Sequence, residues 1–149
     1  MLIVSRTDCD WTEALSGTDE TKQNYPEVLK IGSQFPSSEQ KNISETIALI
    51  RYFRLGAMYV ACDWARPHGL QKTTPREVFA IGKQYPKIYA DLEQELTCVV
   101  ATKKCKFQGY DGACYCWRTC DELRMGVGFL TDFDTEEHWY SFSIPPSIV

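Results

Sequence analysis

Five of the seven cysteines lie in one short stretch of the chain and are its most obvious groups for chemistry: Cys98, Cys105, Cys114, Cys116 and Cys120. Thiolates that converge from two segments bind zinc tetrahedrally, and two adjacent thiols can form a disulfide. The spacing of these cysteines matches no common zinc ribbon or finger, and no Cys-x-x-Cys pair accompanies them. The sequence also contains no Gly-rich phosphate loop or nucleophile elbow, so no motif specifies a reaction.

A hairpin loop over residues 109–112 would bring several of these thiols together. Antiparallel pairing about that loop predicts that Cys105 lies opposite Cys114, with the next two cysteines further along the same face. The candidate zinc ligands are therefore Cys105, Cys114, Cys116 and Cys120. Cysteine is among the most buried residue types, so inert thiols in the core are the favoured interpretation, and a disulfide or redox role is a third.

A second cluster combines four carboxylates with a nearby tryptophan: Asp132, Asp134, Glu136, Glu137 and Trp139. A solvated turn is the simplest interpretation, because acidic residues are ordinary in exposed connections. The functional interpretation is an acidic surface that steers a basic partner, with Trp139 as an aromatic anchor. An EF-hand is excluded, since the sixth loop position carries no glycine.

Cys62 and His68 form a third candidate, because a nucleophilic cysteine needs an imidazole within hydrogen-bond reach. Their closeness in sequence does not establish that geometry. Cys62 ends the most apolar predicted helix, which favours a buried structural thiol. No catalytic residue is assigned.

Two helices are expected to support these residues, over about residues 39–62 and 75–97. Apolar residues at helical spacing indicate the first, although the pattern also allows a break at Gly56 with residues 58–62 extended. For the second, Thr74, Pro75 and Glu77 supply a capping box and a proline at the first helical position. Pro86 is expected to kink or split this helix. A further short helix is predicted over Tyr25–Ile31.

From about residue 97 the apolar period changes to two, which predicts strands over residues 98–102, 113–119, 123–131 and 138–144. Residues 2–5 add a short strand. Helices followed by an antiparallel meander predict an α+β fold with two layers. At 149 residues the chain has the length of a single domain, 1–149.

The net charge of −4 and the 44% hydrophobic content limit the classes of function. The first residues become polar before a signal peptide could form, no stretch is apolar enough to span a membrane, and an odd number of cysteines suits a reducing cytosol. The basic residues of the middle third are diluted and flanked by acid, which argues against nucleic acid and favours a basic protein partner.

These observations predict a small acidic cytoplasmic protein that acts by binding another protein. Its size, charge and lack of catalytic motifs suit an inhibitor, of the immunity-protein or antitoxin kind or of the phage anti-defence kind. Two alternatives stay open: an enzyme that depends on a thiol or a metal, and a structural or regulatory module stabilised by zinc.

Overall fold

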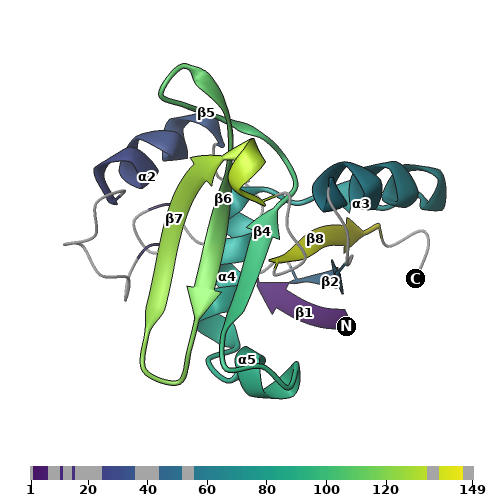
Figure 1. Cartoon of the computed structure of the whole chain (residues 1–149). Helices are drawn as coiled ribbons and strands as arrows, with labels where there is room; N and C mark the ends of the chain where they lie inside the picture. The colour runs from purple at the N-terminus through teal and green to yellow at the C-terminus, as the bar shows by residue number, and fades with distance from the viewer. Residues whose placement is uncertain are drawn as a thin grey trace.

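The computed structural model describes residues 2–6, 11, 15, 25–35, 44–51, 56–133 and 138–145. Within them, one mixed, mostly antiparallel sheet carries three helices of at least seven residues, which confirms the predicted α+β class (Figure 1). The helices are α2 (Tyr25–Ile31), α3 (Ala57–Ala65) and α4 (Pro75–Gln84), with the short α5 (Ile88–Asp91) after them. No helix in this part of the chain is long and apolar enough to cross a membrane.

The strands run in the order β1-β2-β8-β4-β6-β5, with β7 on the other edge of β6 and the two-residue β3 beside β8. Their bounds are β1 Leu2–Arg6, β2 Ser44–Ile50, β3 Gln71–Lys72, β4 Thr97–Ala101, β5 Cys105–Phe107, β6 Tyr110–Arg118, β7 Leu123–Phe129 and β8 His138–Ile144. The four strands predicted from apolar alternation and the short strand predicted over residues 2–5 are all present. Only β5, β6 and β7 follow one another as in a meander, because β8 lies between β2 and β4 and runs parallel to β4.

The predicted helix over residues 39–62 is wrong over residues 44–50, and its residues 39–43 and 52–55 lie outside the described residues. Ser44–Ile50 is a strand that pairs with β1 on one side and with β8 on the other. The apolar residues of this segment fit either period, and pairing on both edges decides the outcome. Gly56 adopts a left-handed conformation (φ 72°), and α3 begins directly after it. A break at Gly56 is therefore present, but the alternative with residues 58–62 extended is wrong, because these residues are helical.

The predicted second helix begins where expected and ends early. The Thr74 N–H donates to Glu77 Oε1 at 2.9 Å, and the Thr74 side chain accepts from a backbone N–H of the first turn, which confirms the capping box. The helix ends at Gln84, because Pro86 cannot continue it, and only the four residues of α5 resume helical structure.

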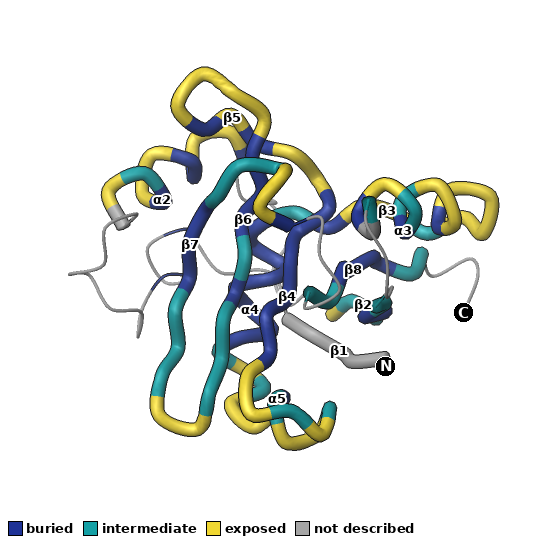
Figure 2. The backbone as a smooth tube through the Cα atoms, viewed as in Figure 1, coloured by how far each residue is buried: buried dark blue, intermediate teal, exposed yellow. Residues whose placement is uncertain are grey.

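Side chains alternate between the two faces of the sheet and form two apolar clusters. On one face α2 and α4 cover a main core that includes Phe79, Ile81, Val99 and Val127. On the opposite face α3 packs over β8, where Met58 and Ala61 meet a second cluster. Figure 2 shows α4 and β4 as mostly buried, whereas the β5–β6 tip and the outer side of α3 are exposed.

Helix α4 approaches β6 closely at Gly82. A Cβ at this position would overlap Cys116 Sγ and lie 3.0 Å from Leu123 Cδ1. Cys116 is itself buried, and neighbouring strands hold it on both sides. The short distance between helix and sheet therefore depends on the missing side chain of Gly82.

A pair of carboxyl groups joins α4 to β2. Glu77 is 8% exposed, and its side chain hydrogen-bonds to that of Glu45. Burial, and then this hydrogen bond, raise the pKa of Glu77 to about 8. Among the described residues, Oε2 of each glutamate is buried without an N–H or O–H donor. A proton on Glu77 therefore satisfies both oxygens.

Candidate binding groove

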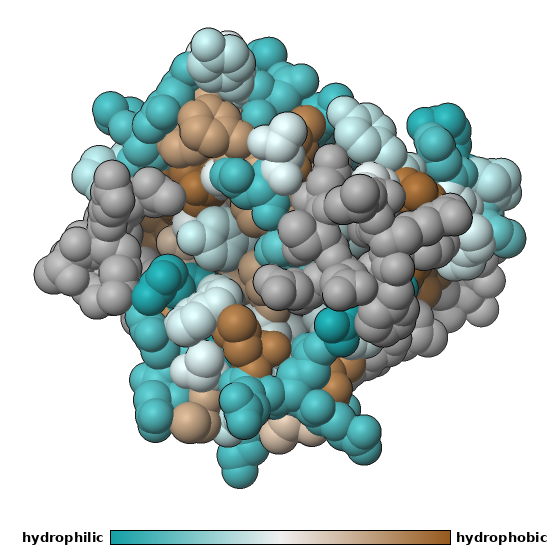
Figure 3. Space-filling view, viewed as in Figure 1, coloured by the Kyte–Doolittle hydropathy of each residue, from teal (hydrophilic) through white to brown (hydrophobic). Residues whose placement is uncertain are grey.

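A groove of about 310 Å³ lies on the face of the sheet opposite α4, over β4, β6, β7 and the first residue of β8. We call it the aromatic groove, and the lining residues that matter here are Cys98, Tyr115, Trp117, Asp132, Phe133 and His138. Figure 3 looks onto this face, where brown and pale side chains gather between teal margins. Four of the six side chains are ring systems, so the groove is a surface for stacking as well as for apolar contact.

Strand alternation explains why these residues gather on this face. Tyr115 and Trp117 are two residues apart on β6, so they share a face, whereas Cys114 and Cys116 point to α4. On the neighbouring strand β7, Tyr115 is paired with Gly126, whereas Trp117 is paired with Arg124. A Cβ at Gly126 would lie 2.6 Å from the Tyr115 ring. The Tyr115 ring therefore occupies this place only because Gly126 has no side chain.

Contacts between aromatic rings hold the side chains of the groove wall in place. The Phe133 ring lies 5.6 Å from Tyr115 and 5.4 Å from His138, the latter in an edge-to-face arrangement. The Arg124 guanidinium lies 4.7 Å from the Trp117 ring centroid and pairs with Glu122 at 3.0 Å. These distances are within the range of favourable aromatic and cation–π contacts. The groove is therefore largely preformed.

Two polar groups of the groove have defined chemistry. Asp132 lies in the 3-10 turn η3 (Leu130–Phe133), where its Oδ2 accepts a hydrogen bond from the Phe129 N–H at 3.1 Å. Burial is the main cause that raises the pKa of the Tyr115 hydroxyl, so this phenol stays neutral. The groove thus offers a carboxylate next to neutral aromatic rings.

Cys98 and His138 occupy directly paired positions of the parallel strands β4 and β8. Both side chains line the aromatic groove, and Asp132 lines it as well. A thiol, an imidazole and a carboxylate are the residue types of a nucleophilic cysteine site. Proximity in the sequence favours Cys62 with His68 instead, because only strand order brings residues 98 and 138 together.

The predicted binding residues are separated by the structure. Asp132 lines the aromatic groove, whereas Asp134, Glu136 and Glu137 lie outside the described residues. Trp139 is on the α4 side of the sheet, half-buried against the main core. Its Nε1–H donates to Gln94 Oε1 at 3.0 Å. Because neighbouring residues of a strand face opposite sides, Trp139 and His138 cannot share a surface.

The four candidate zinc ligands do not converge. The β5–β6 turn consists of Gln108 and Gly109, both with positive φ, rather than residues 109–112. Cys105 is consequently opposite Gly112, and the predicted pairing of Cys105 with Cys114 is wrong by two residues. Cys114 is the diagonal neighbour of Cys105 on the same face of the sheet, and its thiol hydrogen-bonds to Cys105.

The other two cysteines lie elsewhere. Cys116 is buried under α4, and Cys120 is exposed in the turn between β6 and β7. All of the described cysteines are free thiols. Within the described part of the chain, no three of His, Cys, Asp and Glu gather at one point as metal ligands would.

Cys62 and His68 do not line the same pocket. The His68 ring packs on the Trp64 ring, with their centroids 4.6 Å apart. Cys62 lines a pocket that includes Lys72 and Lys104 but not His68. Burial raises the pKa of Cys62, although those lysines partly oppose the shift. Cys62 is therefore a protonated thiol at neutral pH.

A scan against protein-family models, a search of curated proteins and a search of solved structures each found no match.

Proposed function

We propose that the protein acts by binding another protein and that the aromatic groove receives a basic side chain of that partner. The observation that carries the proposal is the placement of Asp132 beside Tyr115 and Phe133 in one preformed groove. Aromatic faces attract lysine and arginine side chains, and a carboxylate at the end of such a groove fixes their charged group. Tyrosine and tryptophan are also the residues that dominate interface hot spots.

Charge supports a basic partner. The chain carries a net charge of −4, and the one cation over the groove wall, among the described residues, already pairs with Glu122. An acidic protein attracts a basic surface over several ångströms and accelerates association at low salt. Blocking a basic surface is how a small acidic inhibitor of the immunity-protein or phage anti-defence kind works, and we propose that class for this protein.

The first prediction tests recognition of a basic side chain. We expect acetyl-arginine amide, titrated into the ¹⁵N-labelled protein, to shift the amide signals of Tyr115, Trp117 and Phe133. Asp132→Asn should weaken this binding by about fivefold at low salt, because it removes the charge while its amide oxygen still accepts from Phe129.

Asp91→Asn is the matched control, since it removes one carboxylate charge from α5, none of whose residues lines the groove. It should leave the affinity unchanged. Shifts spread evenly over the surface, or equal affinity of the Asp132→Asn and native proteins, would show that the groove does not select basic side chains.

A second candidate function, thiol chemistry at Cys98, is favoured by its position opposite His138. If His138 activates this thiol, iodoacetamide at pH 6.5 should alkylate Cys98 faster than the exposed Cys120. His138→Asn should then slow alkylation of Cys98 by about tenfold and leave Cys120 unaffected. Peptide mass spectrometry resolves the two sites. Slow alkylation of Cys98 that does not depend on His138 would remove this candidate.

A further inference from the structure

A second pocket, of about 200 Å³, lies between α3, β3 and the segment after β4, and three cations of different elements line it. Arg66 follows α3, Lys72 ends β3 and Lys104 follows β4. All three line this pocket together with Cys62, and each acts on the Cys62 thiol in the sense that lowers its pKa. We call this the cationic pocket.

The fold holds the walls of the cationic pocket in place. Met58, Cys62 and Arg66 recur every four residues, so they follow one side of α3 and its extension. On the opposite wall, Lys72 is paired with Phe142 of β8. Thr102 is buried beneath the pocket, where its hydroxyl donates to the Ser141 carbonyl oxygen at 2.7 Å. The Lys72 backbone therefore lies on a paired strand, and Lys104 lies directly before β5.

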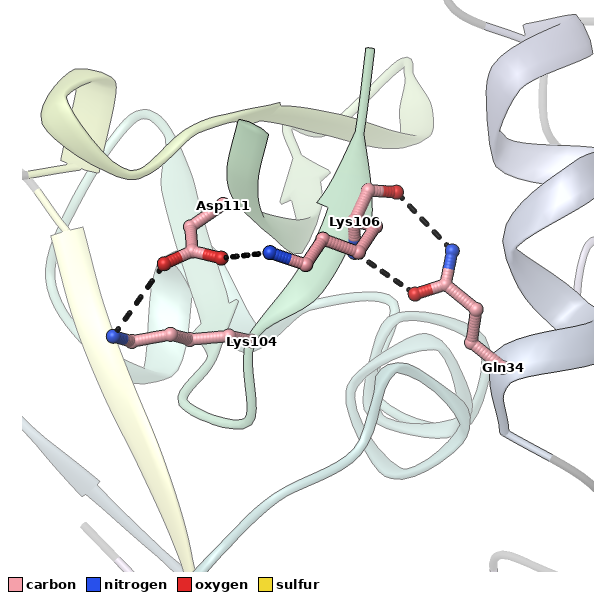
Figure 4. Close-up of polar contacts among 4 residues, drawn as sticks. All are labelled: Gln34, Lys104, Lys106 and Asp111. Carbon is pink, nitrogen blue, oxygen red and sulfur yellow. Dashed lines mark hydrogen bonds and ion pairs between the residues drawn. The ribbon is translucent and has the colours of Figure 1, made fainter. Parts of the chain in front are cut away.

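The cations are only partly neutralised. Asp63 pairs with Arg66 at 3.4 Å, but both side chains are more than 70% exposed, so the pair is weak. Asp111 lies 3.8 Å from Lys104 and only 2.9 Å from Lys106, so Lys104 shares that carboxylate with a closer partner (Figure 4). No ion pair involves Lys72 within the described residues. Among the residues that line the pocket, three cations thus face one carboxylate.

We propose that the cationic pocket binds a phosphate monoester that carries an apolar group. Two net positive charges match a phosphate dianion, with Arg66 as a forked donor and the lysines as point charges. Met58, Tyr59 and Leu130 supply an apolar wall for the organic part. This local excess of positive charge is opposite in sign to the net charge of −4. The site is separate from the aromatic groove and does not depend on its function.

Binding of phenyl phosphate, followed by the chemical shifts of labelled amides, tests the proposal directly. We expect the largest shifts at Cys62, Lys72 and Lys104, and we expect Lys72→Gln combined with Lys104→Gln to weaken binding by about tenfold at low salt. Lys87→Gln, which neutralises a lysine beside α5, is the control and should bind as the native protein does. Equal affinity in all three proteins, or no shifts around the pocket, would overturn the proposal.

Alkylation of Cys62 gives an independent measurement. The anionic reagent iodoacetate and the neutral reagent iodoacetamide attack thiols in the same way, so their rate ratio reports the local electrostatic potential. We expect this ratio to be higher at Cys62 than at Cys120, whose pKa is raised by Asp121 beside it. The two lysine substitutions should lower the ratio at Cys62 by about fivefold, and phenyl phosphate should slow the reaction there. Similar ratios at both cysteines would contradict a cationic site.

Discussion

Replacing Gly82 by alanine is expected to destabilise the fold by about 2 kcal/mol, although the same change stabilises most helices. Alanine gains roughly 1 kcal/mol over glycine in a helix interior. Here the new Cβ would overlap Cys116 Sγ, and a buried side chain between two paired strands has no room to yield. Overpacking of this kind costs about 3 kcal/mol, so the steric effect is larger. Urea denaturation of the native and variant proteins measures the difference.

A double-mutant cycle isolates the contact. Cys116→Ala removes the sulfur that the new methyl group would meet and should cost about 1 kcal/mol when introduced alone. The double variant is expected to be more stable than Gly82→Ala by about 1 kcal/mol, because one change makes room for the other. Additive losses would show that α4 shifts away from β6 instead.

Glu77→Gln is expected to stabilise the protein at pH 9, by on the order of 2 kcal/mol, and to have little effect at pH 4. The pKa of Glu77 is about 8 in the folded protein against 4.5 for a free glutamate. Below pH 4.5 Glu77 is protonated in both the folded and the unfolded state, and the folded protein has its full stability. Between pH 4.5 and 8 the unfolded state loses this proton more readily than the folded state does, so the free energy of unfolding falls as pH rises through this range. Glutamine avoids the loss, because it needs no proton to be neutral.

Glutamine also preserves the contacts of Glu77. Its amide oxygen can accept from the Thr74 N–H, as in other capping boxes, and its N–H can donate to Glu45. Glu95→Gln is a suitable control, because Glu95 is exposed. Denaturation curves between pH 4 and 9 should show a falling stability for the native and control proteins and a flatter profile for Glu77→Gln. Parallel profiles for all three would rule out the shared proton.

Features with local causes could be predicted from the sequence. The start of α4 depends on Thr74 and Glu77, three residues apart, and its end depends on Pro86. The strand β8 has the bounds that alternation predicts, His138–Ile144. In each case, residues close together in the sequence are enough to explain where the element begins or ends.

Features that depend on distant pairing could not be predicted. Ser44–Ile50 is a strand because it pairs with β1 on one side and β8 on the other. No residue within the segment indicates that these strands will be its neighbours. The aromatic groove likewise requires Cys98 and His138 to be neighbours, which follows only from the parallel pairing of β4 and β8. One signal was available: Tyr115 and Trp117 alternate on one strand, while Gly126 and Gly128 alternate on the next. Aromatic residues on one strand beside glycines on the next indicate that the aromatic rings lie over the glycine backbone.

The place of β8 in the sheet has a consequence for how the chain folds during its synthesis. β8 is the last described strand to leave the ribosome, yet β2, β3 and β4 all pair with it. Until it emerges, the β1–β2 ribbon and the β4–β7 ribbon have no strand between them, and each presents an open edge. Open edges recruit strands of other chains. The nascent protein is therefore most exposed to aggregation until β8 has emerged, and a chaperone that shields these edges would act in that interval.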